Sequence, residues 1–390
     1  MNGVKGPTPF SRQDHVDLVW SFPPDYMHGI LLGIVKSLWV MWKRQGCLSA
    51  ADRRQIEKRY VQIRRPREIH RRPRTLKDIA KFKPTEWKSW LLYDSVPCLE
   101  GILDEDRWKS YCLLVDSVAT FLKTRITLEE KDRCDIQLLQ FFGDSQKFYG
   151  PEIMTFNFHI ALHAGEAIDR CGPLWCYSTF PFENGIFHFK GHVLSSTGVT
   201  LQMTNKHLKH MVLKSNIRNN TTSPACRDFC LNLWKPKLLR KYLRTENDLI
   251  LIGAAHDSKR ISTLFSKFLH CTGRKIKLYK RSIFRDMVLR SINYNRSKKT
   301  NDTVVKLRDH KFFRIHNFIY DGSKGYVHGR QISASIYEYN GVIIHHLFRV
   351  TCCNGPELII DPNEIEEKLI FFTIDDKTYI ACFPNNVEIQ

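Results

Sequence analysis

The feature that most constrains the fold of this chain is a change of hydrophobic pattern near residue 303. Before it, apolar residues recur at the three- and four-residue spacing of amphipathic helices. After it, runs of β-branched and aromatic residues are separated by turn pairs such as Asn340-Gly341. The two patterns predict an α+β protein, with a mainly α-helical N-terminal two-thirds and a small antiparallel β domain at the C-terminus.

Capping residues and helix breakers divide the N-terminal part. A helix is expected from Asp25 to Arg44, where Gly46 ends it, and Ser49 is expected to cap the next one. Thr127 and Glu130 have the spacing of a capping box. Three helices are expected between residues 85 and 149, and the others at residues 154–170, 182–195 and 201–216.

The strands are expected at residues 312–320, 331–339, 341–351 and 368–383. The segment before them is rich in Lys and Arg and reads as a partly helical connector. We therefore expect three parts, which are a helical domain at 1–245, a basic connector at 246–302 and a β-rich domain at 303–390.

Positive charge is concentrated in blocks. The chain has 390 residues, with 60 Lys and Arg against 40 Asp and Glu, a net charge of +20. Residues 53–83, 206–244 and 259–308 carry net charges of +10, +9 and +13, so the rest of the chain is net negative. Such segregation is typical of surfaces that bind phosphate backbones, although a basic block can also be an ordinary solvated helix face.

The expected partner is therefore nucleic acid, most simply duplex DNA, and the expected location is the nucleus. The candidate binding residues are Arg64, Arg65, Arg67, Arg71, Arg72, Arg74, Lys275, Lys277, Lys280 and Arg281. Other classes of protein are disfavoured. The apolar stretch from Ile30 to Trp42 is short and interrupted by Lys36, so no membrane span is expected, and 12 cysteines are too sparse for a disulfide scaffold.

Two pairs of residues could hold a metal ion. Asp25 and His28 stand three residues apart at the start of a helix, and His159 and His163 stand four apart on another. A separation of one turn points both side chains of a pair the same way, and four such ligands would suit a structural Zn²⁺ ion. Histidines at this spacing are also common as hydrogen-bonded core residues, so the spacing alone leaves both interpretations open.

Several segments match, in order, the motifs of one transposase family. They are Pro24-Asp25-Tyr26-Met27-His28, Leu31-Leu32-Gly33-Ile34-Val35-Lys36, Arg72-Pro73-Arg74-Thr75-Leu76, Lys83-Pro84-Thr85-Glu86-Trp87-Lys88, Phe156-Asn157-Phe158-His159-Ile160-Ala161-Leu162-His163 and Ser178-Thr179-Phe180-Pro181-Phe182-Glu183-Asn184. In these residues the chain resembles CACTA-type (En/Spm-like) DNA transposases of the animal lineage. The resemblance covers roughly residues 3 to 195.

The resemblance implies a ribonuclease-H-like transposase in which three carboxylates hold two divalent metal ions. It assigns Glu183 as the third of these acids, and it likens Asp25, His28, His159 and His163 to the zinc-binding positions of related recombinases. The family's first two catalytic aspartates precede its Asp-Tyr-Met-His segment, and this chain contains neither of their motifs. One carboxylate cannot hold two Mg²⁺ ions, so we expect no strand cleavage by this chain alone.

Of three possible functions, the first is the one we expect and the second is the main alternative. The first is a transposase-derived protein that binds nucleic acid without cutting it. The second is the C-terminal part of an active enzyme, with Mg²⁺ bound only if the missing carboxylates are supplied from elsewhere. The third is a non-catalytic protein that binds protein or chromatin through its β domain. A homodimer is compatible with each of them.

Overall fold

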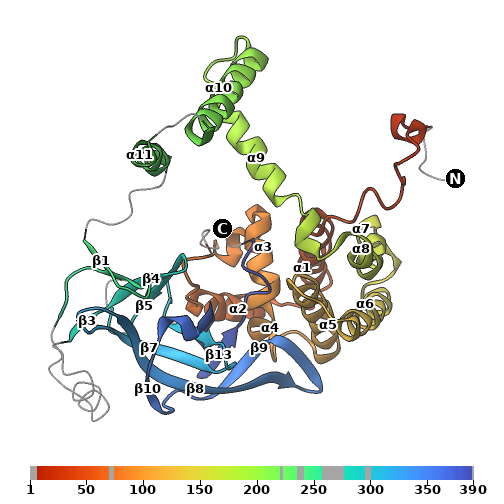
Figure 1. The fold of residues 1–390 in the computed structure, drawn as a ribbon. Coiled ribbons are helices and arrows are strands. Elements are labelled where there is room, and N and C mark those ends of the chain that lie inside the picture. The colour runs from red at the N-terminus through yellow and green to blue at the C-terminus, as the bar shows by residue number, and fades with distance from the viewer. Residues whose placement is uncertain are drawn as a thin grey trace. The chain divides into compact units, whose positions relative to one another are not determined.

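The computed structural model describes residues 7–69, 74–219, 223–234, 241–256, 276–294 and 300–388. The chain divides into two compact units, one formed by residues 1–177 together with 241–390 and the other by residues 178–240. In the first unit a series of helices is followed by antiparallel strands (Figure 1). The α+β class expected from the sequence is confirmed.

The helices of the first unit begin at the caps expected from the sequence. Ser49 forms a capping box with Asp52, and Thr127 forms one with Glu130. The helical segment that reaches Arg44 is also present, but its first turns form a π-helix, η2, before α1 begins. The bounds are η1 Pro9–Arg12, η2 Met27–Val35, α1 Lys36–Arg44, α2 Ala50–Gln62, η3 Leu76–Lys81, α3 Pro84–Ser89, η4 Trp90–Asp94, α4 Ser95–Leu99, α5 Glu105–Phe121, α6 Leu128–Tyr149, η5 Pro151–Ile153, α7 Phe156–Ala161, α8 Ala164–Cys171 and η6 Leu174–Tyr177.

The prediction of a single helix at residues 154–170 is wrong, because the segment forms two helices, α7 and α8. The chain leaves helical geometry at His163, which separates α7 from α8. The reason is that the two pieces pack on different neighbours. α7 lies against η2, where Asn157 fits against Gly33, whereas α8 lies against α6, where Gly165 leaves room for a side chain of that helix.

The strands form two antiparallel sheets. The smaller has the order β1-β2-β4-β5, and the larger has the order β11-β6-β7-β8-β9-β13-β12, with β10 paired to β8 and β3 to β7. Their bounds are β1 Tyr242–Arg244, β2 Ile250–Ile252, β3 Lys277–Tyr279, β4 Arg281–Phe284, β5 Met287–Arg290, β6 Val304–Leu307, β7 Phe312–Tyr320, β8 Gly325–Tyr339, β9 Val342–Cys352, β10 Glu357–Ile360, β11 Ile365–Lys368, β12 Ile370–Ile374 and β13 Lys377–Ala381, with a short helix η7 at Pro362–Glu364.

The expected strands are present, and the described part of the expected connector forms strands as well. β7 has the bounds that the sequence predicts, whereas the run at 368–383 is divided into β12 and β13 by a turn in which Asp375 and Asp376 adopt positive φ. Residues 246–302 contain β2, β3, β4 and β5 in their described part. β3, β4 and β5 each carry one Lys or Arg at an end, and other basic residues lie in the connections between them, so a charge count over the segment conceals the short apolar runs of the strands.

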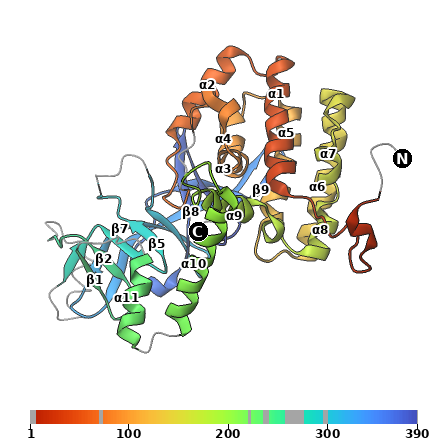
Figure 2. The same ribbon diagram turned by 90° about the horizontal axis from the view of Figure 1, so that it is seen from above.

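The helices and strands of the first unit share one body. Trp42 and Trp90 are fully buried among the helices, and the buried Trp108 of α5 packs against Tyr339 on β8. α5 packs against β9, where the backbone N–H of His345 donates to Asp116 Oδ1 at 2.9 Å. Figures 1 and 2 both show β9 extending toward the helices. The boundary expected near residue 303 therefore does not separate two bodies.

The second unit consists of helices α9, α10 and α11. They span Phe180–Lys190, Val199–Asn219 and Pro224–Trp234, so α9 and α10 correspond to expected helices and α11 does not. α9 buries no residue, and the side chains of Phe182 and Phe187 are 69% and 71% exposed.

Candidate nucleic-acid interface

The first basic block reaches the surface through the loop that follows α2. Arg64 and Arg67 are exposed there. Between them, the Arg65 side chain turns inward, where it lies 2.7 Å from Asp94 Oδ2 and stacks over the ring of Tyr60 at 4.8 Å. Arg65 is only 9% exposed and Asp94 is completely buried. Arg65 was predicted to bind nucleic acid, and its burial corrects that assignment, because a buried ion pair is not available to phosphate.

This loop meets the third basic block. The backbone N–H of Arg67 donates to Asp302 Oδ1 at 2.9 Å, and the backbone N–H of Asn301 donates to the carbonyl oxygen of Arg65 at 3.2 Å. Two basic segments separated by more than 200 residues in the sequence therefore lie side by side. Neither charge count nor periodicity could show this contact.

The two carboxylates at this junction, Glu68 and Asp302, form ion pairs with basic side chains of the strands. Lys368, whose side chain is 2% exposed, donates to both oxygens of Glu68 at 2.7 and 2.8 Å and to Asp302 at 3.0 Å. Arg290 pairs with the other oxygen of Asp302 at 3.0 Å. Lys368 and Arg290 thus occupy the two acids from within the fold.

The other candidates for nucleic-acid binding are distributed more widely. Arg74 is half-buried, and its backbone N–H donates to Glu86 Oε1 at 2.9 Å. Lys277 on β3 is exposed, whereas Lys280 is half-buried and Arg281 stacks over the ring of Tyr294 at 5.1 Å. Arg71, Arg72 and Lys275 lie outside the described residues.

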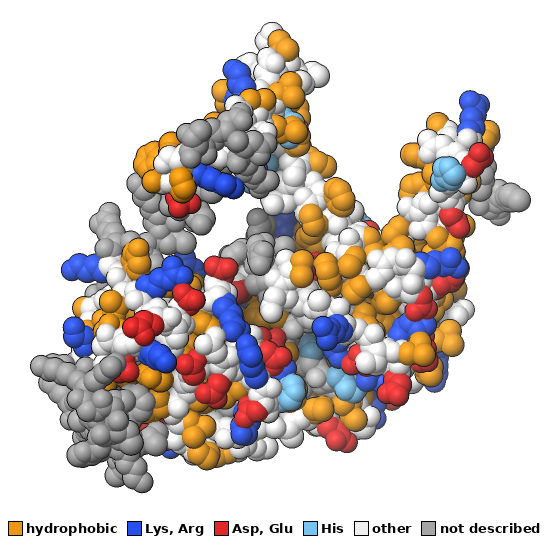
Figure 3. Space-filling view, viewed as in Figure 1, with side chains coloured by type: hydrophobic (Ala, Val, Ile, Leu, Met, Phe, Trp, Pro, Cys, Tyr) orange, Lys and Arg blue, Asp and Glu red, His pale blue; other side chains and the backbone are white. Residues whose placement is uncertain are grey.

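Basic and acidic side chains are interspersed over the face drawn in Figure 3, so a continuous basic surface is not visible there. The convergence at residues 64–67 and 301–302 is therefore the most specific feature of the candidate interface.

The four candidate zinc ligands lie on neighbouring elements but remain as pairs. His28 Nδ1 lies 2.6 Å from Asp25 Oδ2, and the rings of His159 and His163 have centroids 5.1 Å apart. Within the described part of the chain, no three His, Cys, Asp or Glu side chains are grouped closely enough to hold a metal ion. The break before α8 removes His163 from the helix that carries His159, although the two rings stay close together.

Glu183 occupies the first turn of α9, where its backbone N–H donates to the carbonyl oxygen of Thr179 at 2.9 Å. Its side chain is exposed. A carboxylate at this position is favoured by the helix dipole whatever its other role.

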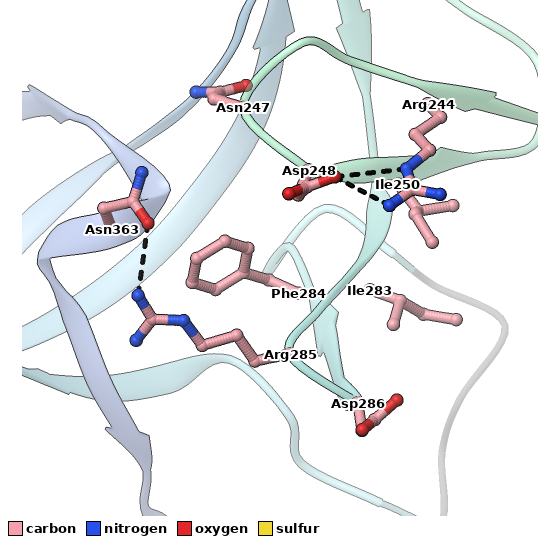
Figure 4. A pocket seen from close by; sticks show the side chains of 9 residues that line it. All are labelled: Arg244, Asn247, Asp248, Ile250, Ile283, Phe284, Arg285, Asp286 and Asn363. Atoms are coloured by element: carbon pink, nitrogen blue, oxygen red, sulfur yellow. Dashed lines mark hydrogen bonds and ion pairs between the residues drawn. The ribbon is translucent and has the colours of Figure 1, made fainter.

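A pocket of about 520 Å³ opens beside the smaller sheet (Figure 4). Arg244 pairs with Asp248 at 2.7 Å, and Arg285 donates to Asn363 Oδ1 at 3.1 Å. Asp286 also lies on the wall, so two arginines and two aspartates balance. The pocket has no net charge to select an anion, and we assign it no role.

Sequence analysis missed a cationic cluster on the larger sheet. Arg314 and His316 alternate on β7, and His328 and Arg330 alternate on β8. On β8 a spacing of two places His328 and Arg330 on one face, and on β7 the ring of His316, at a β-bulge, lies 5.8 Å from the ring of His328. The Arg-x-His and His-x-Arg patterns could have indicated this cluster, but they lie in a region of modest overall charge.

Comparison of the chain with protein-family models, with curated proteins and with solved structures finds no match. Among the residues that the structure describes, no helix is both long and apolar enough to cross a membrane.

Proposed function

We propose that this chain is a transposase-derived protein that binds nucleic acid and does not cleave it alone. The observation that carries the proposal is the contact between two basic segments, in which Arg67 and Asn301 hydrogen-bond across a separation of more than 200 residues to Asp302 and Arg65. The ordered motifs of the resembled family support the transposase origin, and the single acid at Glu183 supports the absence of cleavage.

The exposed arginines of the loop supply the binding energy in this proposal. Guanidinium groups neutralise phosphates and release the counterions that surround a duplex, so affinity falls as salt rises. The surrounding hydrogen bonds hold the loop against the strands, which fixes the spacing of Arg64 and Arg67. We expect binding with little sequence preference, because phosphate contacts carry no base information.

The test is the salt dependence of binding to a random-sequence duplex. The double variant Arg64→Glu with Arg67→Glu should bind more weakly, and the slope of log affinity against log salt should decrease by about 2, since each lost phosphate contact accounts for about 0.9. A matched control is Arg44→Glu with Lys109→Glu, which makes the same change of charge on α1 and α5.

The control should retain both the affinity and the slope of the unmodified chain. Equal losses in the two double variants would show that only net charge matters and would remove the loop from the proposal. No binding by the unmodified chain at about 50 mM salt, where phosphate-driven binding is strong, would overturn the function itself.

A further inference from the structure

Two arginines face each other across neighbouring strands of the larger sheet. Arg314 on β7 and Arg330 on β8 are direct partners in the antiparallel register. Like charges in this position destabilise a sheet unless something compensates them, because their Cβ atoms lie only about 5 Å apart. The two arginines differ in how closely a carboxylate of the chain approaches them.

Arg330 has a distant partner, since its Nη2 lies 3.7 Å from Glu357 Oε2. Arg314 has no carboxylate within ion-pairing distance in the described part of the chain, and its guanidinium lies over the ring of Phe371 at 5.2 Å. The Nε–H of Arg314 is enclosed and has no hydrogen-bond partner. Enclosing a charged donor without an acceptor is costly, so the charge of Arg314 is incompletely compensated within the described part of the chain.

Two histidines complete the cluster. His316 lies at the β-bulge of β7, between the register positions of Ile315 and Asn317, and its ring is 5.8 Å from that of His328. His328 Nε2 lies 2.6 Å from Glu357 Oε1. Bulges redirect side chains and are frequent beside binding sites.

Burial favours the neutral form of both imidazoles. Burial, followed by the positive charge that His328 carries when protonated and by the charges of Arg314 and Arg330, lowers the pKa of His316 to about 4, while Glu357 acts weakly in the opposite direction. Burial also lowers the pKa of His328, against the hydrogen bond and charge of Glu357. With both histidines neutral, two guanidinium groups and one carboxylate leave a charge of +1.

We propose that Arg314, His316 and Arg330 form a binding site for a phosphate group. Arginine forks match phosphate oxygens in geometry and form two hydrogen bonds at once. A cation is disfavoured by the two guanidinium groups, and a phosphodiester, with a charge of −1, matches the site without requiring a proton. A phosphate dianion carries one charge more, and its binding would draw a proton onto His316.

The shared chemistry is therefore phosphate, and its source is either a nucleic-acid backbone or a free phosphate. Binding of a nucleic-acid backbone rests on the proposed function. It would add a phosphate contact on the β strands to the contact proposed at residues 64–67. The second source does not depend on it, because inorganic phosphate is a sufficient ligand. The two proposals can therefore fail separately.

The experiment follows the histidine signals of the full chain by NMR with ¹³C-labelled histidine. Inorganic phosphate and dimethyl phosphate serve as probes, with chloride at equal ionic strength as the control. Both probes should move the His316 signal and raise the midpoint of its titration by up to about one pH unit, because both are monoanions in the pH range where His316 titrates and a nearby anion favours the protonated imidazole. Chloride should do neither.

The variant Arg314→Gln with Arg330→Gln should abolish both responses. If this variant fails to fold, Arg330→Gln alone should weaken them severalfold, because Arg330 is 37% exposed and its substitution leaves the packing on Phe371 intact. The variant Arg64→Glu with Arg67→Glu should leave both responses unchanged, which separates this site from the loop.

A response confined to dimethyl phosphate would indicate a backbone diester as the ligand, and a response to both probes would indicate that free phosphate also binds. The site would be refuted by equal responses to chloride, by responses that survive in the folded double glutamine variant, or by an equal response to acetate, which would indicate an acidic peptide instead.

Discussion

Arg65 Nη2 lies 2.7 Å from Asp94 Oδ2, and this buried ion pair joins the basic loop after α2 to the π-helix η4. The adjacent Arg64 is exposed. Two neighbouring arginines of one basic run therefore have different physical roles, one in the core and one at the surface.

The first prediction compares these neighbours. Arg65→Met should lower the free energy of unfolding by about 3 kcal/mol, because it leaves the carboxylate of Asp94 buried without its partner. Arg64→Met, a matched control, should change it by less than about 0.5 kcal/mol. Urea denaturation measures both. Equal effects of the two substitutions would contradict the burial of Arg65.

The second prediction concerns Lys368, which binds Glu68 and Asp302 and so ties the basic loop to the strands. Lys368→Met should lower the free energy of unfolding by about 3 kcal/mol, because Glu68 and Asp302 both lose a buried partner. Lys377→Met is the control, because Lys377 is 49% exposed and Glu100 keeps its contacts with Tyr337 and Arg349. The control should lower the free energy of unfolding by less than about 1 kcal/mol. A larger loss in the control than in Lys368→Met would show that Lys368 does not hold the loop to the strands.

The third prediction is a pH dependence of stability. The pKa of His316 is lowered from its ordinary value of 6.5 to about 4, so between these values the folded chain binds fewer protons than the unfolded one. The free energy of unfolding should then fall as the pH drops from 6.5 to 4, and His316 should contribute up to about 1.4 kcal/mol per pH unit.

His316→Gln should remove this contribution, which urea denaturation at pH 7, 6 and 5 would show as a shallower slope. Substitution of the exposed His188 by Gln should leave the slope as it is in the unmodified chain. If the slope is also unchanged in His316→Gln, the conclusion that burial lowers the pKa of His316 is wrong.

The fourth prediction concerns the candidate zinc ligands. Because no three of them are grouped, His159→Ala with His163→Ala should leave the free energy of unfolding within about 0.5 kcal/mol of the unmodified value. Elemental analysis of the purified chain should find no stoichiometric zinc. One zinc ion per chain that is lost in the double variant would restore the site.

The fifth prediction concerns cleavage. The purified chain should not nick plasmid DNA in the presence of Mg²⁺, because one carboxylate cannot hold the two ions that phosphodiester hydrolysis requires. Glu183→Gln should therefore leave the plasmid as intact as the unmodified chain leaves it. Nicking that disappears in this variant would establish an active site and overturn the proposal.

Local structure was largely predictable. The caps at Ser49 and Thr127, the helical spacing before Arg44 and the β-branched and aromatic run of β7 depend on neighbours within a few residues, which the sequence displays directly. The helix break at His163 was not predictable, because it arises from the packing of α7 and α8 on separate partners.

The sequence by itself determined the α+β class and the concentration of positive charge, because hydrophobic period and composition are local properties of the chain. Only the tertiary structure decided which charges remain at the surface. Arg65 and Lys368 are buried by partners far from them in sequence, Arg314 and Arg330 become neighbours through strand register, and residues 64–67 meet residues 301–302. Such contacts depend on the packing of distant segments, which no local pattern encodes.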